Sequence, residues 1–151
     1  MDDVVSKFVR KSKVLYSEAL DDLERGNFNK AVSGFYFSVE ALANAIVYKY
    51  RQRVRGFMGR VNIISKLVSK DVGKKMLYLY ELRVLADHKE TLLVESDARE
   101  AEKIANYLIN ELRKSLSKLF QLSENSLRFM NSRLIWIQEH FSCVLKYWQE
   151  F

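Results

Sequence analysis

The chain has 151 residues, and its 25 Lys and Arg against 19 Asp and Glu give a formal net charge of +6. This length fits one domain, and the positive charge permits an anionic partner such as nucleic acid without requiring one. A single cysteine excludes an internal disulfide and a thiolate metal site. Because proline is absent and glycine occurs only five times, we expect an all-α domain of long helices. We expect no metal or cofactor, since one cysteine and two histidines form no cluster of metal ligands.

The N-terminal residues MDDVVSK begin with acidic side chains, unlike a signal peptide. We find no apolar run that approaches the roughly 18 residues of a typical membrane-spanning helix. The sequence therefore predicts a cytoplasmic protein without a membrane segment.

Two helices joined by a tight turn are predicted for the first third of the chain. Apolar residues recur on one face of residues 4–24, and a denser apolar stripe follows over residues 28–50. Between these stretches, Gly26 is typical of a helix end and Asn27 is a plausible N-cap for the second helix. Because the connection is so short, we expect the two helices to be antiparallel neighbours.

The second predicted helix leads into the basic stretch KYRQRVRGFMGR, residues 49–60, which contains no acidic residue. Cations at the end of a helix interact favourably with its dipole. Clustered cations can also contact the phosphates of a nucleic acid. The stretch is therefore either a solvated helix end or a phosphate-binding patch, and its basic residues are Lys49, Arg51, Arg53, Arg55 and Arg60.

Two shorter helices are predicted next. After a break flanked by Gly56 and Gly59, residues 60–69 can form a helix. The following stretch, residues 72–86, is apolar on nearly every side, and a helix of that kind is normally buried all round. It should lie in the middle of the bundle or form half of a dimer interface. The inward positions expected in the first of these helices are Val61, Ile64 and either Leu67 or Val68.

Charged residues interrupt the apolar stretch near its end. Arg83 shares a helix face with Asp87, and His88 follows directly. A buried guanidinium without a partner is costly, so Arg83 should pair with Asp87 or with a bound anion. Residues five apart on a helix point about 140° away from each other. Arg83 and His88 therefore meet only if the helix ends or bends between them, or if a second chain supplies the counterpart.

A long amphipathic helix is predicted from Ser96–Asp97 onward, where Asp97 and Glu100 resemble a capping box. We assign residues 1–122 to the bundle and residues 123–151 to a C-terminal helical extension. The extension has a strict heptad pattern, which suits packing on the protein's own bundle or self-association. His140 and Cys143, which lie in it, are expected to be structural. The heptad residues are Leu127, Met130, Leu134, Ile137, Phe141, Val144 and Trp148.

Three segments together resemble the HEPN family of small helical domains over roughly residues 5–120: RGNFNKAVSGFYFSVEALANAIVYK, LRVLADH and ESDAREAEKIANYLINELRKSL. The most specific element is an arginine followed by four residues and a histidine, here Arg83 and His88. The resemblance implies an antiparallel bundle of four or five helices, here with an extra C-terminal amphipathic helix. It also implies a homodimer that brings two copies of the motif together.

The activity implied by the resemblance is that of a metal-independent endoribonuclease, often the toxin of a toxin–antitoxin pair. His88 would transfer protons, Arg83 would stabilise charge on the phosphate, and Asp87 would support them. RNA would be held by Lys49, Arg51, Arg53, Arg55 and Arg60.

The family also includes noncatalytic members, which are proposed to bind nucleotides or to partner a minimal nucleotidyltransferase. The expected partners are therefore a second copy of the chain, together with RNA, a nucleotide or such an antitoxin. No DNA specificity is implied.

Overall fold

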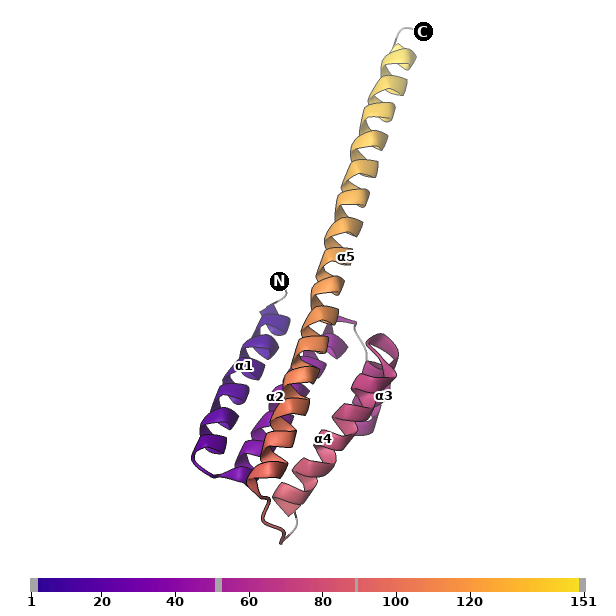
Figure 1. The fold of residues 1–151 in the computed structure, drawn as a ribbon. Helices are drawn as coiled ribbons and strands as arrows, with labels where there is room; N and C mark the ends of the chain where they lie inside the picture. Colours follow the sequence, from indigo (N-terminus) through magenta and orange to yellow (C-terminus); the bar gives the residue numbers. More distant parts are fainter. Residues whose placement is uncertain (1–2, 51–52, 89, 150–151) are drawn as a thin grey trace. The chain divides into compact units, whose positions relative to one another are not determined.

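The structure is a computed structural model that describes residues 3–50, 53–88 and 90–149, with side chains through residue 128 except those of 123 and 127. These residues form five helices and no strand, which confirms the all-α class (Figure 1). The chain divides into two compact units, Met1–Leu116 and Ser117–Phe151. The helices are α1 (Asp3–Glu24), α2 (Phe28–Lys49), α3 (Gly56–Leu67), α4 (Lys70–His88) and α5 (Glu95–Gln149).

A tight turn joins α1 to α2, as the sequence predicts. Gly26 has a φ of 78°, a left-handed conformation that glycine adopts without a Cβ clash. Asn27 occupies the N-cap position of α2, but its side chain makes no capping hydrogen bond and instead donates to Asp22 Oδ1 at 3.1 Å. The two helices approach closely where Gly34 faces Ala19, since a Cβ on residue 34 would lie 2.9 Å from the Ala19 Cβ. Asn27 is therefore the N-cap residue of α2, as predicted, although its side chain does not cap the helix.

The helix at the centre of the first unit is α2, which contacts α1, α3 and α4. Among the described residues, it is the one helix long and apolar enough to span a membrane, but 72% of its apolar window is buried inside the protein. Burial on several sides is typical of a core helix in a helical bundle. Its fully buried large side chains include Val32, Phe35, Val39, Leu42 and Ile46.

The third helix starts earlier than the sequence suggests. It begins at Gly56, whose φ is 69°, and not at Arg60. Gly59 therefore lies inside α3, where a Cβ would come within 2.9 Å of a Val54 methyl group. The predicted inward positions Val61 and Ile64 are buried, as expected.

Only one face of α4 is buried within the chain. Val72, Met76 and Leu79 form its inner face, whereas Tyr78 and Leu85 are exposed. The expectation that this helix lies in the middle of the bundle is therefore wrong for a single chain. The alternative, a dimer interface, stays a prediction.

The last helix starts at Glu95, with Val94 before it. Asp97 is the third helical residue, and its carboxylate accepts a hydrogen bond from the Val94 backbone N–H at 3.0 Å. The predicted start at Ser96–Asp97 is thus late, and Glu100 instead accepts a hydrogen bond from the Tyr78 hydroxyl at 3.1 Å. This contact ties α4 to α5 within the first unit.

The region predicted as a C-terminal extension, residues 123–151, is helical through Gln149 and belongs to α5. The heptad side chains, His140 and Cys143 lie outside the described side chains, apart from their helical backbone. The packing of this region, the boundary at residue 122 and the structural roles of these two residues stay predictions.

Candidate functional site

The ion pair between Arg83 and Asp87 lies near the end of α4. Arg83 Nε is 2.7 Å from Asp87 Oδ2, and the two side chains are 22% and 27% exposed. Arg83 Nε is nevertheless buried without a hydrogen bond of acceptable geometry, so the contact is mainly electrostatic. The Ser33 hydroxyl donates to the other Asp87 oxygen and joins α2 to the pair. Of the two partners that the sequence allows for Arg83, the structure therefore shows the carboxylate.

Two aromatic rings of α2 complete the surroundings of Arg83. The guanidinium carbon lies 5.1 Å from the ring centre of Phe37 and 5.6 Å from that of Tyr36, within the range of cation–π attraction. The Tyr36 hydroxyl donates to Glu40 Oε1 at 3.0 Å. Burial, reinforced by the negative charge of Glu40, raises the pKa of Tyr36 above its usual range. Tyr36 therefore stays neutral and holds the carboxylate of Glu40 close to the helix interface.

A second arginine uses the same carboxylate. Arg60 Nη1 lies 2.7 Å from Glu40 Oε1, and Arg60 Nε donates to Asn44 Oδ1 at 2.7 Å. These contacts attach α3 to α2. We call this set of residues on α2, α3 and α4 the paired-cation face: Tyr36, Glu40, Arg60, Arg83 and Asp87.

His88 is the last residue of α4. Its imidazole is exposed and has no hydrogen bond or ion pair with the described residues. Since α4 stays helical through His88, Arg83 and His88 point about 140° apart and do not converge within one chain. The imidazole is therefore free to meet a solvent-borne substrate or a second chain.

Asn29 shapes the connection that follows His88. Its amide group donates to the Ala86 carbonyl at 2.8 Å, and its side-chain oxygen accepts from the Leu93 backbone N–H at 2.9 Å. One side chain thus satisfies backbone groups on both sides of the connection. Sequence reasoning missed Asn29, because its partners lie 57 and 64 residues away along the chain.

The basic stretch is not next to His88. Ser33, near the start of α2, contacts Asp87, so α2 and α4 run in opposite directions (Figure 1). Lys49 ends α2, about 24 Å along the helix axis from Ser33. Arg53 and Arg55 follow and are exposed. The structure therefore places these cations and His88 at opposite ends of the first unit.

The other two members of the basic stretch differ from these. Arg51 lies outside the described residues. Arg60 is already engaged by Glu40 and Asn44, so its charge is partly neutralised. The stretch does not form one continuous set of free cations.

No protein-family model matches the chain, and no curated protein is significantly similar to it in sequence. The resemblance to HEPN domains accordingly rests on the order of the helices and on the Arg83 and His88 motif.

Proposed function

We propose that the protein is a HEPN-like, metal-independent endoribonuclease that acts in the cytoplasm as a homodimer. Its reactive groups are the side chains of Arg83 and His88. The observation that carries the proposal is the exposed imidazole of His88 at the end of α4, which has no partner among the described residues and lies just beyond a partly buried arginine. An imidazole can take the proton of a ribose 2′-hydroxyl as that oxygen attacks phosphorus, and can protonate the departing 5′-oxygen. This step needs no metal.

Arg83 suits the role of phosphate ligand. Only its Nε approaches Asp87, and its guanidinium donates no hydrogen bond to the described residues. The two terminal nitrogens can therefore donate to phosphate oxygens whose charge grows during the reaction. The carboxylate and the two rings keep the guanidinium in place between turnovers.

A second copy of the chain is required by the geometry of this proposal. Arg83 and His88 diverge within one chain, so an arginine and a histidine can face the same phosphate only when two copies meet. Apolar side chains are exposed at this end of the unit, including Leu85, Val94 and Leu92, the last 83% exposed. Such a surface is suited to burial against another chain.

The test is cleavage of RNA by the purified full-length protein in excess chelator. We expect His88→Ala to lower the rate at least about 100-fold, the usual effect of losing a proton-transfer group. Thr91→Ala, which changes an exposed side chain in the following connection, is the matched control and should cleave at the wild-type rate. Equal cleavage by wild type and His88→Ala would reveal a contaminating nuclease and reject the proposal. Light scattering should show a dimer.

A second candidate is a noncatalytic module that binds a nucleotide or partners a minimal nucleotidyltransferase. The pairing of Arg83 with Asp87 favours it, since a neutralised arginine is typical of a structural residue. In that case the wild type would bind RNA or a nucleotide without cleaving RNA. His88→Ala would then leave binding unchanged.

A further inference from the structure

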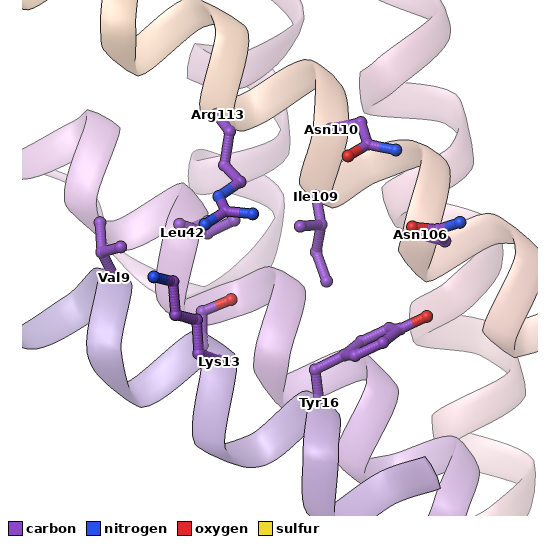
Figure 2. Close-up of a pocket in the computed structure, with 9 residues that line it drawn as sticks. Val9, Lys13, Tyr16, Leu42, Asn106, Ile109, Asn110 and Arg113 are labelled. Atoms are coloured by element: carbon purple, nitrogen blue, oxygen red, sulfur yellow. The ribbon is translucent and has the colours of Figure 1, made fainter.

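A cavity of about 200 Å³ lies between α1, α2 and the first part of α5, all within the Met1–Leu116 unit. Figure 2 shows Lys13 and Arg113 on one side of Ile109, with Tyr16 and Asn106 on the other. The proposed ribonuclease mechanism uses none of these residues. The lining residues are Val9, Ser12, Lys13, Tyr16, Leu42, Asn106, Ile109, Asn110 and Arg113.

The charged and amide side chains at this cavity are not engaged by other side chains in the described part of the protein. Lys13 and Arg113 have no acidic partner among the described residues, and the amides of Asn106 and Asn110 make no hydrogen bond there. Ser12, only 2% exposed, also lines the cavity. Two cations and two amides beside one partly apolar cavity are the kind of groups that orient a bound ligand.

Arg99, which lies on α5 like Arg113, differs from it in having acidic partners. Its guanidinium lies within 3.4 Å of carboxylate oxygens from Glu24, Glu95 and Glu102. The chain thus neutralises one arginine of α5 with three acids but places none beside Arg113. Two like charges at one cavity repel each other, and an anion between them removes that repulsion.

The remainder of the cavity is apolar or aromatic. Leu42 is buried, and Ile109 projects between the two polar sides (Figure 2). Tyr16 packs against Phe35 with ring centres 5.4 Å apart. Burial raises the pKa of Tyr16, and the charge of Glu102 adds to this, so its hydroxyl stays protonated and can donate a hydrogen bond.

We propose that this cavity binds a small organic anion, with its acidic group between Lys13 and Arg113 and a ring-sized body against Leu42 and Ile109. An apolar cavity of about 150 Å³ accommodates benzene. A volume of about 200 Å³ therefore suits one ring with a carboxylate or phosphate substituent. Polar substituents of the ring would face Asn106 and the Tyr16 hydroxyl. Most pockets of this kind combine an apolar body with a few polar groups that orient the ligand.

Titration calorimetry on the full-length protein tests the site with four probes: benzoate, phenyl phosphate, benzyl alcohol and inorganic phosphate. We expect saturable binding of benzoate, phenyl phosphate or both, and the stronger of the two identifies the acidic group. Benzyl alcohol and inorganic phosphate each lack one half of the ligand and should bind at least about tenfold more weakly. Equal binding of either one would overturn the proposal, as would no saturable binding of both ring anions up to about 10 mM.

Charge-removing variants locate the binding. Arg113→Gln and Lys13→Gln should each weaken the binding of the ring anion about tenfold, which is the effect of losing one charge-assisted hydrogen bond. Lys103→Gln and Lys11→Gln remove the same charge from exposed positions on the same helices outside the cavity, and should bind as wild type does. Equal weakening in all four variants would indicate nonspecific attraction and reject the site. Since Arg83 and His88 are intact in every variant, failure here would leave the ribonuclease proposal standing.

Discussion

Two regions of the bundle differ in whether their cations are paired with carboxylates. On the paired-cation face, Arg60 and Arg83 each lie between helices and have a carboxylate within 2.7 Å. At the cavity, Lys13 and Arg113 are exposed and have no acid among the described residues. A charge removed from water needs a partner to offset its desolvation, whereas an exposed charge does not. The first pair therefore joins helices, and the second pair is available to a ligand.

The largest effect on stability should come from Glu40→Ala. This change leaves both Arg60 Nη1 and the Tyr36 hydroxyl without their acceptor. We expect the free energy of unfolding to fall by about 2–3 kcal/mol, because hydrogen bonds to charged groups are among the strongest. Urea denaturation measures it, with Glu18→Ala at an exposed position of α1 as the control. A loss no larger than that of the control would show that the network contributes no stability.

Asp87→Ala should have the next largest effect on the free energy of unfolding. It removes the counter-charge of Arg83 and the acceptor of the Ser33 hydroxyl. Because both charged side chains are partly exposed, we expect a loss of about 1–2 kcal/mol, below that for a fully buried pair. Asp21→Ala, an exposed change on α1, is the matched control in the same denaturation experiment. Unchanged stability would mean that Tyr36 and Phe37 hold the guanidinium without the carboxylate.

The pH dependence of the stability of Tyr36→Phe tests the environment of Tyr36 on the paired-cation face. At neutral pH, losing the hydrogen bond to Glu40 should lower the free energy of unfolding by about 1 kcal/mol. The pKa of Tyr36 is raised in the folded state, so its contribution is complete below the unfolded-state value of about 10 and is lost as the pH rises above it.

The stability difference between wild type and Tyr36→Phe should therefore shrink above about pH 10. Thermal unfolding at several pH values up to about pH 11 measures this, with the exposed Tyr48→Phe as a control for the loss of one phenol. A difference that stays constant over this range would contradict the assigned environment of Tyr36.

The smallest effect on the free energy of unfolding is expected from Arg113→Gln in the absence of ligand. The change removes one of two like charges at the cavity and breaks no ion pair among the described residues. Stability should stay within about 0.5 kcal/mol of wild type. Arg60→Gln, which breaks the contact with Glu40, is the comparison and should be clearly destabilised. A large loss in Arg113→Gln would mean that this arginine is structural and that the two regions do not differ as described.

Local features were the most predictable part of the fold. The apolar periodicity of α1 and α2 and the turn at Gly26 were predicted correctly, because each depends on residues close together in the sequence. Helix starts were less predictable. At the start of α5, Asp97 bonds the Val94 N–H, so the helix begins before the acidic residue that suggested its cap.

The candidate site was predictable only in part. The sequence allowed Asp87 as a partner of Arg83, since the two are one helical turn apart. It grouped the basic stretch with His88, but the antiparallel packing of α2 and α4 separates them. The spacing of Tyr36 and Glu40 along α2 also suits a contact on one helix face, yet their shared contacts with Arg83 and Arg60 required α3 and α4 to be in place.

The sequence by itself determined the helical class, the approximate helix spans and the presence of an arginine that needs a partner, because periodicity and charge act over one or two turns. Only the tertiary structure decided which cations are neutralised. Glu40 reaches Arg60 across 20 residues of chain. The cavity combines Lys13 of α1, Leu42 of α2 and Arg113 of α5. Such groups meet only when whole helices pack, since no local pattern records which faces of distant helices will touch.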